Sequence, residues 1–176
     1  AGTPGNASKI IDDSTGLVLK LTSGVEAFFF PIGDDTSYAP IEVNMAAGGT
    51  AMNPWMGVNA TAQKHPNNAN VTNHTRRFWR VFTHDLFFPE YSVIANYWEA
   101  DVVGSEASIS MGKYTGTLPW KKYGAAATGS NTLTAPSVTE DYAEFTGIST
   151  PGPGNTGPLN VSICYSATAK LTATAP

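Results

Sequence analysis

Cysteine and charge are both scarce in this sequence of 176 residues, and each scarcity excludes a class of protein. Its single cysteine, Cys164, excludes an intrachain disulfide framework and a zinc site made of cysteine thiolates. Charged residues make up 14% of the chain, against about 25% in an average soluble domain. The sequence also lacks any run of about 18 apolar residues, so it predicts no membrane-inserted helix.

Positive charge is especially sparse. Ten Lys and Arg residues face 14 Asp and Glu residues, which gives a net charge of −4. This balance predicts no nucleic-acid partner and no attraction to an anionic membrane. Arg76, Arg77 and Arg80 form the one basic cluster, and we interpret it as a solvated strand end.

What the sequence does contain is turn chemistry and short apolar segments. It has 17 glycines, 12 prolines and 41% hydrophobic residues, and no segment has convincing helical periodicity. Strand-like segments recur every 8–12 residues or so, which predicts an all-β fold, an antiparallel β-sandwich of immunoglobulin-like or jelly-roll-like type. The predicted strands are residues 8–12, 16–21, 25–33, 38–45, 55–63, 76–85, 91–101, 106–114, 117–124 and 141–149. The intervening segments 46–54, 64–75, 86–91 and 124–137 are predicted to be loops, turns or connections.

Composition divides the chain into four parts. Residues 1–7 read as an N-terminal arm, residues 8–149 as the β-sandwich domain, and residues 150–158 (TPGPGNTGP) as a Pro/Gly linker. Residues 159–176 then alternate between apolar and polar side chains, which is the pattern of one long strand. At about 3.3 Å per residue, fifteen such residues would span roughly 50 Å. A strand of that length either bends or extends beyond a compact domain.

Several short motifs resemble a known family. They are Phe30–Gly33 (FPIG), Tyr38–Pro40 (YAP), Arg77–Val81 (RFWRV), Met111–Tyr114 (MGKY) followed by Trp120, and Asp141–Gly147. Together they resemble a β-sandwich module of secreted and cell-surface proteins of Bacteroidetes-type bacteria that is associated with type IX secretion. The resemblance covers roughly residues 8–149. It implies export, an extracellular or cell-surface location and no catalytic residues, while the long alternating strand stands where the family usually has a sorting domain.

Candidate chemical sites are few. Glu90, Glu99, Asp101 and Glu106 are the only acidic cluster near aromatic strands, and a glycosidase would need two such carboxylates across a cleft. We predict that the protein is not an enzyme.

The sequence offers one candidate metal site and one candidate ligand site. The pair Asp34 and Asp35 could bind calcium, although aspartates in turns usually bond their own backbone. Apart from a calcium ion at this pair, we predict no cofactor. Among the four tryptophans, Trp55 and Trp120 are candidates for stacking on a glycan, although aromatic residues in central strands more often belong to the core.

Two functional hypotheses follow. In the first, the protein is a structural subunit that polymerises with itself into a surface filament, because its C-terminal strand completes a neighbouring copy. The anchors of that strand would be Leu159, Val161, Ile163, Tyr165 and Leu171. In the alternative, the protein is a carbohydrate-binding or adhesion module of a larger surface protein, and its partner is a polysaccharide or host surface. Its last strand would then fold back onto its own domain.

Overall fold

The computed structural model describes residues 5, 7–12 and 15–149, and within them the protein is all-β. The described part has no α-helix, only two short 3₁₀ turns, and therefore no helix long and apolar enough to cross a membrane. The Pro/Gly linker, the predicted C-terminal strand and its five anchor residues lie outside the described residues.

The strands form one large antiparallel sheet and two short two-stranded ladders. The large sheet contains β2 (Val18–Leu21), β3 (Glu26–Phe30), β5 (Ile41–Thr61), β7 (Phe78–Asn96), β9 (Ile109–Tyr114), β10 (Lys121–Ala125), β11 (Thr132–Val138) and β12 (Tyr142–Ser149). The ladders pair β1 (Ile10–Ile11) with β4 (Ile32–Gly33) in parallel, and β6 (His74–Thr75) with β8 (Val102–Val103) antiparallel. The 3₁₀ turns are η1 (Glu99–Asp101) and η2 (Glu106–Ser108).

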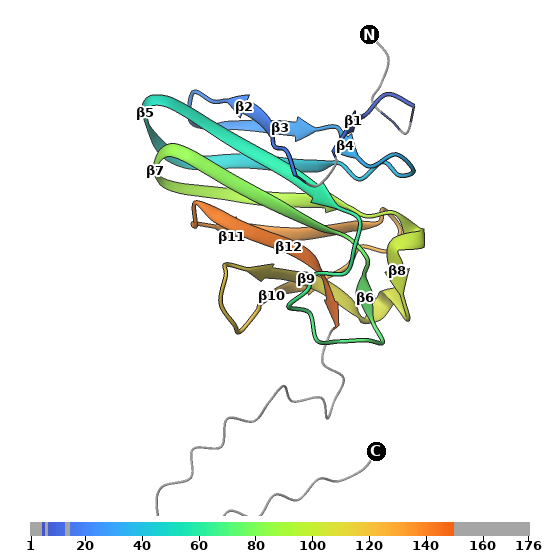
Figure 1. Cartoon of the computed structure of the whole chain (residues 1–176). Coiled ribbons are helices and arrows are strands. Elements are labelled where there is room, and N and C mark those ends of the chain that lie inside the picture. Colours follow the sequence, from blue (N-terminus) through green and yellow to red (C-terminus); the bar gives the residue numbers. More distant parts are fainter. Residues whose placement is uncertain (1–4, 6, 13–14, 150–176) are drawn as a thin grey trace, which may run out of the picture.

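Two very long strands organise the sheet. The 21 residues of β5 pair with the 19 residues of β7 from Ile41 opposite Ala95 to Thr61 opposite Phe78. One half of this ribbon continues into β3 and β11, and the other half into β2, β12, β9 and β10. Figure 1 shows the ribbon doubling back near its middle, so that its two halves lie in two layers.

The predicted loop 46–54 and turn 86–91 are therefore wrong, because both segments belong to continuous strands. The register shifts three times between Met45 and Trp55, and the ladder continues between the shifts. Extra residues on either strand let both bend together without losing their pairing. At the bend, Phe88 has a φ of 52°, in the left-handed region.

The predicted connection 124–137 is also wrong in part, because it contains most of β11. Leu133 and Ala135 are buried and lie opposite Ala95 and Val93 of β7. The sequence signal was a short alternation of apolar residues, interrupted by Pro136, whose missing N–H is tolerated at the edge of a sheet.

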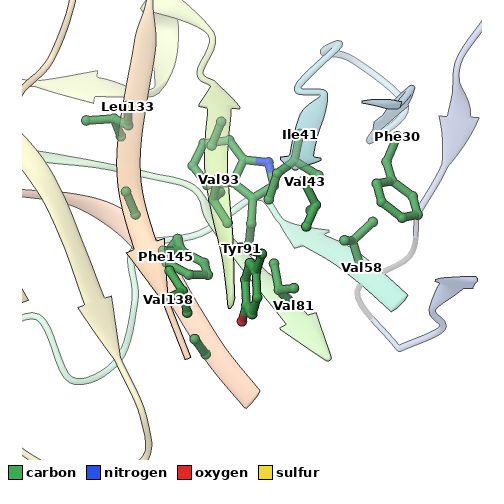
Figure 2. Packing of buried hydrophobic residues seen from close by; sticks show 14 of the residues in the cluster. Phe30, Ile41, Val43, Val58, Val81, Tyr91, Val93, Leu133, Val138 and Phe145 are labelled. Carbon is green, nitrogen blue, oxygen red and sulfur yellow. The ribbon is translucent and has the colours of Figure 1, made fainter. Parts of the chain in front are cut away.

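Both halves of the folded sheet contribute to one core. Val43, Tyr91 and Val93 from one half pack in the same cluster as Val58 and Val81 from the other. Figure 2 shows these side chains converging between the ribbons. Among the described residues, burial of this apolar surface is the main stabilising contribution, at about 25 cal/mol per Å².

An ion cluster ties the chain segments together beside the core. Arg77 has an exposed fraction of only 1% and bonds Asp34 (2.6 Å), Asp101 (2.6 Å) and Ser37 (2.5 Å). Burial alone would raise the pKa of the Asp34 carboxyl, but hydrogen bonds from Thr36, Ser37 and Arg77 outweigh it and hold that pKa well below its ordinary value. The interpretation of the basic cluster as a solvated strand end is therefore wrong for Arg77.

Candidate binding surface

The two outer faces of the folded sheet differ in chemistry. The face of the β3–β11 half carries mainly small and polar side chains, including Glu42, Asn44, Ser92 and Thr134. The face of the β2–β10 half carries aromatic residues from four consecutive strands or the segments beside them. Since both faces cover the same core, folding alone does not require this difference.

Strand register arranges the aromatic residues along a diagonal. Trp55 lies opposite His84, Phe82 opposite Tyr142, and Tyr114 opposite Glu144, so each step along the line moves to a further strand. From Trp55 to Tyr114 the line crosses three strand spacings and four residue positions, or roughly 20 Å. We call this set the aromatic diagonal: Trp55, His84, Phe82, Tyr142, Tyr114 and Trp120.

The first end of the aromatic diagonal is a stacked pair. The rings of Trp55 and His84 have centroids 5.1 Å apart and an interplanar angle of 25°. Gly57, the next outward-facing residue on β5, provides space for them: a Cβ there would lie 3.1 Å from Trp55 Cζ3 and 2.7 Å from Leu19 Cδ2. Glycine therefore lets the indole and Leu19 lie close against the sheet.

A second pair stands in the middle of the line. The rings of Phe82 and Tyr142 are 4.8 Å apart and tilted by 45°. The Tyr142 hydroxyl donates a hydrogen bond to Glu144, whose second carboxylate oxygen contacts His65 Nε2. Burial and the neighbouring Glu144 charge raise the pKa of Tyr142 to about 12, so the hydroxyl stays protonated near neutral pH.

The far end of the aromatic diagonal packs around a buried histidine. The centroid of the His65 ring lies 4.8 Å from the ring centroid of Trp120, 5.3 Å from that of Tyr114 and 4.9 Å from that of Phe78. The backbone N–H of Asn67 donates to His65 Nδ1, so Nε2 carries the proton that faces Glu144. Burial lowers the pKa of His65, whereas the hydrogen bond and charge of Glu144 raise it. Burial has the larger effect, so the neutral ring is favoured.

A row of polar side chains runs beside the line. Asn59, Arg80 and Glu144 lie side by side on β5, β7 and β12. The Arg80 guanidinium lies 3.7 Å from the Glu144 carboxylate, 3.5 Å from the side-chain amide oxygen of Asn59 and 4.7 Å from the Phe78 ring centroid. Its side chain remains 26% exposed, so it faces both its partners and the solvent.

The structure places the two selected tryptophans at opposite ends of this line. Trp55 and Trp120 are both half-buried and do not stack on one another. Sequence reasoning missed the residues between them, Phe82, His84 and Tyr142. The alternation of residues along β7 could have indicated them, because Phe82 and His84 alternate with the buried Val81 and Thr83 and must therefore lie on the outer face of the strand.

Three of the other predicted site residues, Asp34, Asp101 and Glu106, make structural contacts. Asp34 accepts hydrogen bonds from Thr36, Ser37 and Arg77, and Asp35 is exposed. Asp101 pairs with Arg77, and Glu106 accepts a hydrogen bond from Tyr97. Among the described residues, no three His, Cys, Asp or Glu side chains gather as metal ligands.

A second exposed feature is the margin formed by β1, β2, β3 and their connections. Seven of the thirteen exposed large apolar side chains in the described part of the chain lie there. We call this set the apolar margin: Ile10, Ile11, Leu17, Leu19, Leu21, Val25 and Phe29. Figure 1 shows these strands together at one border of the folded sheet.

Fold and surface together define a class: an all-β protein with a large antiparallel sheet, one aromatic outer face and one apolar border. Comparisons of the chain with protein-family models, with curated proteins and with solved structures find no match.

Proposed function

We propose that this protein is a non-catalytic, extracellular structural subunit that joins copies of itself by β-strand addition. In this proposal the folded sheet is a β-sandwich of the secreted, cell-surface type that the FPIG, YAP and RFWRV motifs resemble. Residues 159–176 of one copy add to the apolar margin of the next. The observation that carries the proposal is the concentration of exposed apolar side chains on a border where β2 and β3 each have one strand partner among the described residues.

Of the four border strands in the large sheet, β3 fits an incoming strand best. The other three carry features that discourage pairing: Lys20 on the inward parity of β2, Lys121 and Lys122 on β10, and Pro136 on β11. In contrast, the one charged residue of β3, Glu26, stands at its first position and pairs with Lys20, and β3 pairs with β5 over five residues without a register shift. Its sequence, EAFFF, also favours extended structure.

The donor segment matches this acceptor in composition. Residues 150–176 contain one charged residue, Lys170, and the apolar side chains of residues 159–175 fall on one parity apart from Cys164. Strand addition would supply main-chain hydrogen bonds, while Val161, Ile163 and Tyr165 would supply contacts to one face. Because the contact joins different surfaces of two copies, it repeats and produces a filament.

The test compares the full chain with a chain ending at Ser149. We expect light scattering to show assemblies that grow with concentration for the full chain and folded monomers for the shorter one. A synthetic peptide of residues 159–176 should bind the shorter chain. Phe29→Lys on β3 should weaken that binding at least tenfold, whereas Thr134→Lys, an exposed position on β11, should not.

Two outcomes would contradict the proposal. A full chain that stays monomeric at high concentration would indicate that the segment pairs within its own chain. Equal peptide binding by the Phe29→Lys and unmodified proteins would show that β3 is not the acceptor.

A further inference from the structure

We propose that the aromatic diagonal binds an extended, uncharged polysaccharide. This inference concerns a different element from self-assembly, because the aromatic diagonal lies on β5, β7, β12 and β9, whereas the proposed acceptor strand is β3. It rests on the positions of the rings, on the polar row beside them and on the charge balance of the face.

The spacing of the rings suits a chain of sugar units. The Trp55–His84 pair and the Phe82–Tyr142 pair are separated by one strand spacing and two residue positions, or roughly 8 Å. The line then continues to Tyr114, for a total of roughly 20 Å. A pyranose ring has an apolar face of C–H groups, which packs on an aromatic ring, so successive rings would hold successive units of one extended chain.

The polar row provides partners for the sugar hydroxyls. A guanidinium has five N–H donors, and Arg80 donates one hydrogen bond to the side-chain amide oxygen of Asn59 and forms an ion pair with Glu144. The Arg80 side chain is 26% exposed and lies on the same face of β7 as Phe82, two residues away, so it can donate to a ligand that contacts the Phe82–Tyr142 pair. An aromatic platform with a few fixed polar groups is the usual composition of a small-molecule site.

Charge on the face argues for a neutral ligand. Arg80 lies 3.7 Å from Glu144, and His84 lies 3.7 Å from Asp85, so the two basic groups on the aromatic diagonal and its polar row each have an acidic neighbour. Their positive charge is therefore balanced locally and offers little attraction to a uronic acid or sulfated polymer. The same balance disfavours a strongly basic partner.

The experiment measures binding of the full chain to soluble polysaccharides by affinity electrophoresis and isothermal titration calorimetry. Mixed-linkage β-glucan, xyloglucan and glucomannan serve as neutral ligands, and polygalacturonate serves as the anionic one. We expect binding to at least one neutral polymer and none to polygalacturonate. Trp55→Ala and Tyr142→Ala should each weaken binding at least tenfold.

Matched controls separate this site from the rest of the molecule. Trp98 is an exposed tryptophan outside the diagonal, so Trp98→Ala should bind like the unmodified protein. Phe29→Lys should also bind normally, which distinguishes this site from the acceptor strand of the proposed filament. Circular dichroism of each variant confirms that a loss of binding does not reflect unfolding.

Three binding results would overturn the inference. They are no binding to any neutral polymer, binding to polygalacturonate alone, and equal binding by Trp55→Ala and the unmodified chain. A concentration-dependent dimer that Trp55→Ala dissociates would instead assign the face to a second copy, which also overturns it.

Discussion

Arg77 places a guanidinium where water does not reach, between the carboxylates of Asp34 and Asp101. Removing one member of a buried ion cluster leaves the others desolvated without compensation. We therefore expect Arg77→Met to lower the free energy of unfolding by about 3–5 kcal/mol, measured by urea denaturation. Arg76→Met, at the exposed neighbouring position, should change it by less than about 0.5 kcal/mol. Equal effects of the two substitutions would contradict this role.

The lowered pKa of His65 makes the free energy of unfolding depend on pH. Burial lowers its pKa in the folded state, so the unfolded chain takes up a proton first as the pH falls through about 6.5. Stability should be fully present above that pH and should decrease from about pH 6.5 towards pH 5. His74, whose pKa burial also lowers, contributes in the same direction.

The measurement is the urea midpoint between pH 5 and pH 7.5. His65→Gln should reduce the slope of stability against pH, even if it also lowers stability at every pH. His84→Gln changes an exposed ring and serves as the control. An unchanged slope in His65→Gln would show that this ring does not contribute to the pH dependence.

At the scale of elements, the sequence patterns predicted the positions of most strands. They did not predict the length of β5 and β7, the two strands that organise the sheet. The apolar alternation around Ile41–Met45 and Met56–Ala60 was readable, and both segments are strands. The segment between them is rich in glycine and alanine, which locally indicates a loop. It stays extended because β7 pairs with it at Ala47, Gly49 and Thr50, and such long-range pairing has no local signal.

The two longest strands of the sheet, β5 and β7, both bend within the domain. A strand of about fifteen residues was expected to bend if one compact domain contained it. Both β5 and β7 are longer than that, and both bend at the shared register shifts. Their apolar parity resumes after the bend, so that Val43 and Val58 enter the same core.

The bend itself carries backbone strain that can be tested at Phe88. This residue has a φ of 52° and an exposed fraction of 93%, so its ring adds little burial while its backbone lies in a region that bulky residues avoid. Asparagine tolerates this region. We expect Phe88→Asn to raise the free energy of unfolding by up to about 1 kcal/mol, or about 2–4 °C in Tm.

Phe87→Asn is the matched control for the bend. Phe87 is not among the positive-φ residues, and its ring atom Cδ2, which the substitution removes, lies 3.7 Å from the position that a Cβ on Gly49 would occupy. This substitution should therefore lower the free energy of unfolding. If Phe88→Asn lowered it equally, the Phe88 ring would be a packing element and the strain argument would be wrong.

At the scale of the whole molecule, the candidate surface could be predicted only in part. Trp55 and Trp120 were selected by residue type, but the line that joins their surroundings depends on the register of four strands. Register is set by long-range pairing and the bend, and neither is visible in local sequence. The buried state of Arg77 was missed for the same reason, because its partners lie 24 and 43 residues away.

The single shared core predicts how the domain unfolds. Since β5 and β7 run through both layers, neither layer can lose its strands without exposing the core of the other. The chain ending at Ser149 should therefore unfold in one cooperative transition, with a calorimetric enthalpy equal to the van't Hoff enthalpy. For roughly 140 ordered residues at about 0.7 kcal/mol each, that enthalpy should be about 100 kcal/mol near 60 °C.

Far-UV circular dichroism and the fluorescence of the buried Trp79 in a variant lacking the other tryptophans should give the same midpoint. Two separated transitions would mean that each layer has a core of its own, and an unfolded 1–149 chain would mean that residues after Ser149 complete the fold rather than connect one copy to another.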